Sequence, residues 1–418
     1  MEIKLKNLPQ QSGRRLFFVY LANLFLSFHL YLILYINSSF LQKFFSPIVL
    51  GWIYIVGSIL NLILLLAAPK LIKKIGIYSL TILFIVLEGL AIFGLSLAHT
   101  PVLVALLSVL HLAVIAMIFF GLDIFLEEYS PIDERKTGSI RGTFLTISNV
   151  TLVIAPVIAG FILVNGDFSK IYLASFLFLI PLLLTLIMGL KGKPDFHGLI
   201  PQISTDQIPG IQQSISVRQT IKRIYTNKNL HGIFMVQFIL QFFYAWMVIY
   251  MPIHLHQNLG FSWPNIGLIF TIMLLPFALF ELPIGKMEDK NLGEKEVMIL
   301  GFIITALSVA IIPFIREASL IIWAILLFLT RTGASFIEVS AESYFFKHVN
   351  SSNSDTISLF RMTRPLSFIV APIIAASTLF LLNFFSLIYG LSFLVLSLIV
   401  LYGIRYSLMI TDTKNEKN

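Results

Sequence analysis

The sequence predicts an all-α membrane protein in which twelve transmembrane helices form two pseudo-symmetric six-helix bundles. Hydrophobic residues make up 57% of the chain and charged residues only 12%, whereas a soluble domain carries about 25% charged residues. Twelve apolar runs reach the roughly 20 residues that a helix needs to cross a bilayer. Features of the first half also recur in the second half, as expected of two related bundles.

The expected spans follow one another closely, except for one hydrophilic interval in the middle of the chain. This interval divides the sequence into an N-terminal six-helix bundle (1–190), a cytoplasmic linker (191–230) and a C-terminal six-helix bundle (231–418). The spans are expected at 16–37, 47–69, 78–98, 101–125, 142–163, 171–190, 231–254, 263–285, 297–315, 319–344, 357–381 and 383–405.

The linker begins with prolines and ends in a pattern typical of a short amphipathic helix. A basic helix of this kind lies on a membrane surface, so we expect a tether between the bundles. A regulatory or partner-binding site is the alternative. The apolar stripe consists of Val217, Ile221 and Ile224, and the basic face of Arg218, Lys222 and Arg223.

The basic residues predict the orientation, because Lys and Arg gather in cytoplasmic loops. Of the 29 Lys and Arg residues, only Lys43, Lys170 and Arg316 fall in loops opposite to the N-terminus, and Arg331 falls inside a span. We therefore expect an integral protein of the plasma (inner) membrane with both termini in the cytoplasm. The net charge of +8 follows from this placement, and no nucleic-acid partner is expected.

The internal repeat involves acidic, aromatic and prolyl positions. At the ends of corresponding spans, Asp123, Glu127 and Tyr129 are matched by Glu338, Glu342 and Tyr344, and in the next spans Ala155-Pro156 is matched by Ala371-Pro372.

Two motifs resemble those of the major facilitator superfamily. The loop after span 8 reads Gly285-Lys-Met-Glu-Asp289-Lys290-Asn-Leu-Gly293-Glu-Lys295. It is similar to the family's signature, Gly-x-x-x-Asp-Arg/Lys-x-Gly-Arg-Arg/Lys, with one residue inserted before the second glycine. In the first-half copy, Lys73 replaces the aspartate. The span 5 segment Ala155-Pro156-Val-Ile-Ala-Gly160 resembles a motif that accompanies antiport in that family.

The resemblance implies a secondary active transporter that moves a small organic solute by alternating access, with spans 1, 4, 7 and 10 lining the cavity. Proton coupling is favoured over sodium coupling, because titratable side chains outnumber any visible cage of carboxylates and carbonyls. Alternatives are an antiporter that exports hydrophobic or drug-like compounds and, from another class, a non-transporting membrane scaffold or enzyme.

Charges at the cytoplasmic ends of spans predict a gate. Acids four residues apart share a helix face and require a cation or a proton. We expect gating or proton coupling, with static interfacial charge as the alternative. The acids are Asp123, Glu127, Glu338 and Glu342, and the available cations are Arg141, Arg361 and Arg364. The resemblance also implies that Asp289 closes the inner gate near Arg141.

Charges deeper in the membrane mark the expected solute site. Arg331 lies roughly 18 Å into span 10 and Glu88 roughly 16 Å into span 3, at 1.5 Å per residue. Charges at that depth face protein or water. We assign Arg331 to the solute and Glu88 to proton coupling or packing, with an Arg331–Glu88 structural pair as the alternative.

Neutral polar residues on the expected lining helices complete the solute site. Helix–helix hydrogen bonding is their alternative role. His29 lies on the opposite face of span 1 from the polar stripe and is left out. The residues assigned to the site beside Arg331 are Asn23, Ser27, Tyr31, His111, Asn149, Gln237, Gln241 and Tyr244.

The sequence does not support enzyme chemistry. It has no cysteine, and neither a Glu-x-x-His nor a His-x-x-x-His pattern nor a glycine-rich phosphate loop is present. We expect no cofactor and no metal. The expected partners are a small-molecule substrate, the lipid bilayer and protons, and the expected oligomeric state is a monomer.

Overall fold

A computed structural model describes residues 8–129, 134–190, 217–290, 293–349, 354–384 and 389–411. Over these ranges the regular structure is helical, and twelve helices are long and apolar enough to cross a membrane. This confirms the predicted fold class. The twelve are α2 (Leu8–Leu34), α4 (Pro47–Ile75), α5 (Ile77–Leu97), α6 (Pro101–Tyr129), α7 (Glu134–Ile162), α8 (Phe168–Gly189), α10 (Lys228–Ile253), α11 (Trp263–Lys290), α12 (Glu294–Ile311), α13 (Leu320–His348), α14 (Ser354–Phe384) and α15 (Ser392–Met409).

Short elements lie between the spans. Helix α3 (Asn37–Leu41) follows α2, α9 (Val217–Thr226) precedes α10, and a π-helical turn (His254–Asn258) extends α10. Helix α15 begins at Ser392, later than the expected 383, because α14 continues to Phe384 and a 3₁₀ turn over Tyr389–Leu391 leads into α15. Apolar composition alone does not register that change of backbone.

Local sequence signals set several helix ends. Pro47 and Pro101 occupy the first position of α4 and α6, where a missing N–H costs nothing and the fixed φ suits a helix. Asp167 caps α8 by accepting the N–H of Ser169 at 3.0 Å. Gly76 joins α4 to α5 with a φ of 81°, a conformation that glycine adopts without steric cost.

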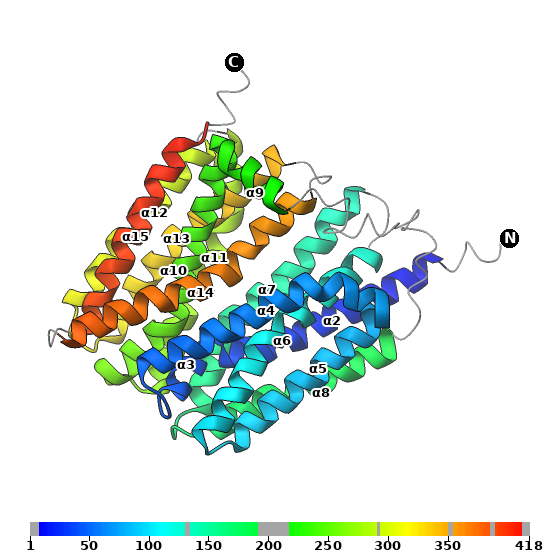
Figure 1. Cartoon of the computed structure of the whole chain (residues 1–418), viewed down its shortest axis with the longest axis horizontal. Helices are drawn as coiled ribbons and strands as arrows, with labels where there is room; N and C mark the ends of the chain where they lie inside the picture. Colours follow the sequence, from blue (N-terminus) through cyan, green and yellow to red (C-terminus); the bar gives the residue numbers. More distant parts are fainter. Residues whose placement is uncertain are drawn as a thin grey trace.

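The helices form two bundles that follow the order of the chain. Helices α2 and α4–α8 pack together, and α10–α15 form the second group (Figure 1). We call the end at which α2 begins and α15 ends the near end, and the opposite end the far end. In Figure 1 the bundles converge towards the far end and diverge towards the near end.

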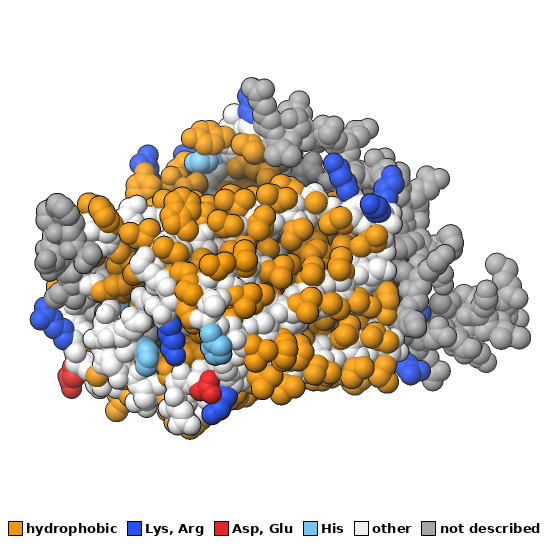
Figure 2. Space-filling view, turned by 60° about the horizontal axis from the view of Figure 1, so that its bottom comes forward, with side chains coloured by type: hydrophobic (Ala, Val, Ile, Leu, Met, Phe, Trp, Pro, Cys, Tyr) orange, Lys and Arg blue, Asp and Glu red, His pale blue; other side chains and the backbone are white. Residues whose placement is uncertain are grey.

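Apolar side chains face outwards on most spans, and hydrophobic residues cover much of the face seen in Figure 2. A large apolar surface of this kind suits contact with lipid. Helix α10 differs, because 78% of its most apolar stretch is buried. It therefore lies inside the protein, where its polar residues can take part in a site.

The two bundles are in direct backbone contact near the far end. A Cβ atom at Gly160 of α7 would lie 2.6 Å from the backbone oxygen of Trp263, and one at Gly267 of α11 would lie 2.5 Å from that of Pro156. Glycines allow such an approach between helices. The cavity between α2, α7 and α11 measures about 10 Å³, room for roughly one water. The far end is therefore closed.

Candidate solute site and coupling groups

Arg331 of α13 is buried against α10 in the C-terminal bundle. It is 2% exposed, and its guanidinium carbon lies 5.2 Å from the ring centroid of Phe243 and 4.9 Å from that of Tyr244, both on α10. These are cation–π contacts. In the described part of the chain, its Nε and Nη2 atoms have no hydrogen-bond partner. The guanidinium therefore retains donors for a ligand.

Small residues on the other side of α13 help to place this arginine. A Cβ atom at Gly301 of α12 would lie 2.6 Å from the backbone oxygen of Gly333. This close packing of α12 on α13 holds α13 in position beside α10. The long Arg331 side chain then fits between α13 and the aromatic rings of α10.

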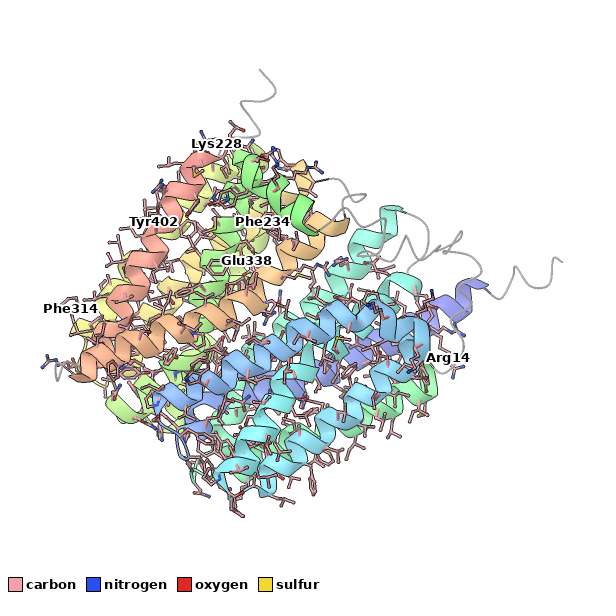
Figure 3. All side chains as sticks on the ribbon, in the orientation of Figure 1. Arg14, Lys228, Phe234, Phe314, Glu338 and Tyr402 are labelled. Atoms are coloured by element: carbon pink, nitrogen blue, oxygen red, sulfur yellow. The ribbon has the colours of Figure 1, made fainter. Side chains whose placement is uncertain are left out.

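An acid and a second arginine lie near Arg331. The hydroxyl of Tyr244 donates a 2.6 Å hydrogen bond to Oε2 of Glu338, which Figure 3 places within the C-terminal bundle. Arg364 of α14 is close enough to interact electrostatically with Glu338 and with Tyr31 of α2. Side chains from α2, α10, α13 and α14 thus converge between the two bundles.

Gln237 and Gln241 lie on α10, on the same face as Tyr244. Each is 7% exposed, and Oε1 of Gln237 has no partner among the described residues. Their position on the buried helix agrees with the expected site. Direct contact with a solute stays a prediction.

Two residues expected in the solute site make hydrogen bonds between helices, and their contact with a solute stays a prediction. The side-chain amide of Asn23 donates to the backbone oxygen of Phe144 at 2.8 Å and to Oγ of Ser148 at 3.0 Å. Ser27 donates to the same Ser148 at 3.2 Å. These bonds join α2 to α7. Asn149 is half-buried on α7, and its role in solute binding stays a prediction.

Charged side chains connect the bundles at the near end. Arg141 pairs with Glu127 at 2.7 Å, and Arg361 of α14 lies 3.8 Å from Asp123 of α6. Glu342 is exposed and interacts electrostatically with both arginines. All these groups are half-buried or exposed, and such pairs contribute only about 0–1 kcal/mol. They could therefore break and re-form during a conformational cycle. The side chain of Asp289 lies outside the described residues.

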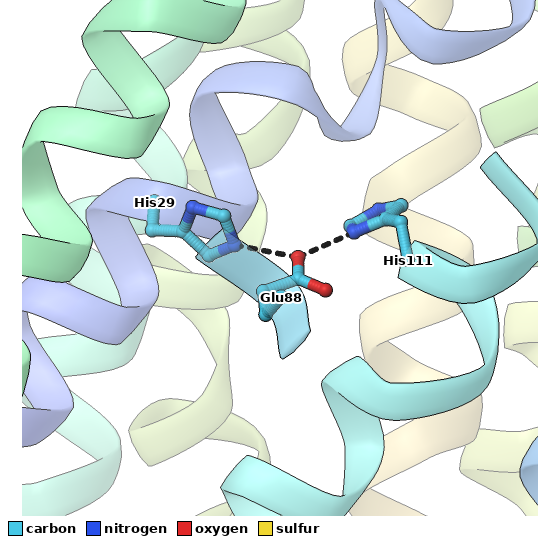
Figure 4. A group of neighbouring side chains, drawn as sticks. All are labelled: His29, Glu88 and His111. Atoms are coloured by element: carbon cyan, nitrogen blue, oxygen red, sulfur yellow. Dashed lines mark hydrogen bonds and ion pairs between the residues drawn. The ribbon is translucent and has the colours of Figure 1, made fainter. Parts of the chain in front are cut away.

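A separate cluster of titratable groups lies inside the N-terminal bundle (Figure 4). Oε1 of Glu88 on α5 lies 2.8 Å from Nε2 of His29 on α2 and 2.5 Å from Nδ1 of His111 on α6. None of the three is more than 2% exposed. Glu88 therefore binds two histidines of its own bundle and is not the partner of Arg331.

His29 and Phe243 belong to these sites although the sequence analysis does not select them. His29 faces away from the polar stripe of α2, and that face points into the bundle. A histidine and a carboxylate at similar depths on two different spans could have indicated that His29 pairs with Glu88. Phe243 could not be singled out among 38 phenylalanines.

Comparison with known proteins agrees with the fold. The major facilitator superfamily model matches residues 16–266 and 233–417. No curated protein matches the chain significantly. Among solved structures, a POT family transporter in complex with 5-aminolevulinic acid is similar, with a TM-score of 0.72, 13% sequence identity and 94% of each chain covered. The resemblance inferred from the loop and span 5 motifs is confirmed: the chain belongs to the major facilitator superfamily of membrane transporters.

Proposed function

We propose that this protein is a proton-coupled secondary transporter that moves a small carboxylate-bearing organic solute, anionic or zwitterionic, by alternating access. The proposal depends mainly on Arg331, a buried arginine with unpartnered donors on a lining helix. A charge at the centre of a membrane span costs at least roughly 2.5–3.5 kcal/mol. A bound carboxylate would offset that cost through charge-assisted hydrogen bonds.

The ring contacts around Arg331 support an oriented site. Phe243 and Tyr244 lie against the guanidinium group, which limits its rotation without using its donors. A planar guanidinium can bind a carboxylate through two parallel hydrogen bonds, which lysine cannot reproduce. The nearby Glu338 would suit the ammonium group of a zwitterion, and it would repel a second carboxylate.

The arrangement of the bundles supports alternating access. Backbone contacts close the far end, and the bundles diverge at the near end, where the half-buried to exposed pair Arg361–Asp123 connects them. With both termini in the cytoplasm, as the basic loops favour, this is an inward-facing conformation. The linker 191–230 would then tether the bundles on the cytoplasmic side.

Two acids away from the protein surface, the half-buried Glu338 and the buried Glu88, support coupling to protons. Glu338 contacts Tyr244 beside Arg331, and Glu88 contacts two histidines in the other bundle. Carboxylates in such positions can exchange a proton when their surroundings change. A cationic drug is disfavoured as the solute, because Arg331 would repel it.

The experiment is a binding screen on purified protein by thermal shift. It compares carboxylate-bearing compounds with cationic drugs. The carboxylate-bearing compounds are monocarboxylates, dicarboxylates, amino acids and related zwitterions, and 5-aminolevulinic acid is the first zwitterion to be tested. Carboxylate-bearing compounds should raise the melting temperature of the wild type. Arg331→Ala should abolish the shift, and Arg331→Lys should weaken it.

Arg316→Ala is the matched control, because Arg316 is exposed near the far end. It should retain the shift of the wild type. An Arg331→Ala variant that folds and binds the same carboxylates with unchanged affinity would refute the assignment. So would stabilisation by cationic drugs alone.

A further inference from the structure

The cluster in the N-terminal bundle has a geometry that fixes where its protons lie. Both imidazoles contact the same oxygen of Glu88, at 2.8 Å from His29 and 2.5 Å from His111. The other oxygen, Oε2, is buried and has no partner among the described residues. Figure 4 shows the carboxylate between the two rings. Each short N···O contact requires one hydrogen between its two atoms.

Ser175 of α8 determines the protonation of the far side of the His29 ring. Its hydroxyl has one hydrogen, which it donates to the backbone oxygen of His29 at 2.8 Å. The ring atom Nδ1 of His29 faces Oγ of Ser175 at 2.8 Å and the backbone oxygen of Ser175 at 3.2 Å. Both are then acceptors, and the backbone oxygen can act in no other way, so we infer that Nδ1 carries a hydrogen. The contact between Nε2 and Glu88 needs another.

Counting hydrogens gives the charge of the cluster. One hydrogen lies on Nδ1 of His29, one between His29 and Glu88, and one between Glu88 and His111. A carboxylate with two neutral imidazoles holds one hydrogen fewer and has a charge of −1. The bonded arrangement is therefore neutral. Burial away from water favours the neutral form strongly over a lone charge.

We propose that His29, Glu88 and His111 form a binding site for one exchangeable proton inside the N-terminal bundle, separate from the solute site, and that this proton is the one coupled to transport. The coupling role rests on the proposed function. The site itself does not, because proton binding can be measured without any solute.

The cluster is placed so that its proton can influence the interface between the bundles. His29 belongs to α2, the helix that also carries Tyr31 next to Arg364. With the proton bound, α2 is joined to α5 through Glu88 and to α8 through Ser175. Loss of the proton leaves the cluster with a buried charge of −1 and removes one of the hydrogens that form its contacts. Both effects alter how firmly α2 is held in its bundle.

The surroundings contain no competing charge among the residues that the structure describes. The groups acting electrostatically on Glu88 are the two histidines, from α2 and α6. Helix α8 contributes the neutral Ser175, and α4 contributes the neutral Asn61, which donates to the backbone oxygens of Leu112 and Ala113 beside His111. The proton count of the cluster is therefore set by these three side chains.

The same donor set could in principle hold a metal ion, but the distances favour protons. Zinc binds imidazole nitrogen and carboxylate oxygen at about 2.0–2.2 Å, so its ligand atoms lie roughly 3.3 Å apart. The two N···O distances in the cluster are 2.8 and 2.5 Å. These are hydrogen-bond distances.

The first test counts protons directly. Protein with ¹⁵N-labelled histidine should show a doubly protonated ring at about pH 7, where an isolated histidine is mostly neutral. This signal should be absent in His29→Gln and in Glu88→Gln. It should persist in His99→Gln, the matched control, because His99 is exposed. A wild-type spectrum without a doubly protonated buried ring would overturn the site.

The second test measures the conformational effect. A cysteine replaces Ala159, which is 2% exposed and lines the closed far end. Its rate of maleimide labelling is divided at each pH by that of a cysteine at the exposed position 142, because the reactive thiolate fraction itself rises with pH. This ratio should change several-fold between about pH 6 and about pH 8. Glu88→Gln and His111→Gln should each remove this response, and Glu296→Gln, an exposed acid, should keep it. A wild-type response that survives in both folded variants would overturn the proposal.

Two further measurements separate the possible failures. Arg331→Ala should keep the pH response of labelling, even if the carboxylate screen identifies no ligand. Loss of the response in Arg331→Ala would show that the two sites are one. Added Zn²⁺ should leave the melting temperature unchanged. A rise in the wild type that is absent from Glu88→Gln would show a metal site and refute the proton assignment.

Discussion

Tyr244 contacts both charges of the candidate solute site. Its ring lies 4.9 Å from the guanidinium carbon of Arg331, and its hydroxyl donates a 2.6 Å hydrogen bond to Glu338. One side chain of α10 thus joins a cation and an acid of α13. The arginine and the acid need no direct contact with each other, so both remain able to meet a zwitterionic solute.

Tyr244→Phe tests this bridge. The ring and its cation–π contact remain, but Glu338 loses its donor. A hydrogen bond to a charged group contributes about 1.5–3 kcal/mol, so the melting temperature should fall. Affinity for a zwitterion should fall more than affinity for a simple carboxylate, because Glu338 is no longer held in place. Tyr225→Phe, at an exposed tyrosine, should change neither. Equal losses for both ligands would contradict the bridging role.

Asn23→Ala tests the connection between α2 and α7. The substitution leaves the backbone oxygen of Phe144 and the hydroxyl of Ser148 without this donor, which costs about 1–3 kcal/mol for buried groups. The double variant Asn23→Ala, Ser148→Ala should lose less stability than the sum of the single variants, because the partners share one network. Carboxylate affinity should stay unchanged. A large fall in affinity at preserved stability would return Asn23 to the solute site.

Length and hydropathy were enough to predict the fold, because a bilayer demands apolar helices of fixed length. The predicted spans match α4 and α6 at their first residues, Pro47 and Pro101, where proline marks the start. The largest difference is at α15, which begins at Ser392 after a 3₁₀ turn. That turn falls inside the expected span 12, because an apolar run does not distinguish a 3₁₀ turn from an α-helix.

The candidate site was harder to predict, because helical periodicity gives a face but not the neighbour that covers it. Depth along span 10 predicts an enclosed Arg331, and its side chain is buried on α13. The polar stripe of α2 predicts a cavity-facing surface, and in the structure Asn23 and Ser27 of that stripe bond to α7. His29 faces Glu88 across the bundle. Such pairings depend on the rotation of each helix, which only packing determines.

Exchange of the near-end charges tests the bridge between the bundles. Arg361 and Asp123 lie 3.8 Å apart and both are substantially exposed, so their pairing contributes up to about 1 kcal/mol. Asp123→Asn should shift the population towards a wider near end by at most about fivefold. Spin labels on cysteines introduced at Gly142 and Glu296, one in each bundle, would report the longer distance.

The reversed pair, Asp123→Arg with Arg361→Asp, should restore the wild-type distance distribution. High salt should imitate Asp123→Asn in the wild type, because the Debye length falls to about 3 Å at 1 M. Identical distributions in wild type and Asp123→Asn at low salt would show that the pair does not influence the conformation.

Gly267→Ala tests the seal at the far end. The added Cβ would lie 2.5 Å from the backbone oxygen of Pro156 on the other bundle, and backbone on both sides leaves no flexible side chain to move away. Overpacking of this kind costs about 1–3 kcal/mol. Because the cost falls only on the state in which the far end is closed, the population should shift towards far-end opening by roughly 5–150-fold. Labelling of a cysteine at position 159 should accelerate accordingly.

Gly142→Ala is the matched control, since nothing lies within 4 Å of its added Cβ. It should label as slowly as the parent. If Gly267→Ala folds and its far end stays as inaccessible as in that control, the glycine contact is not what closes the far end.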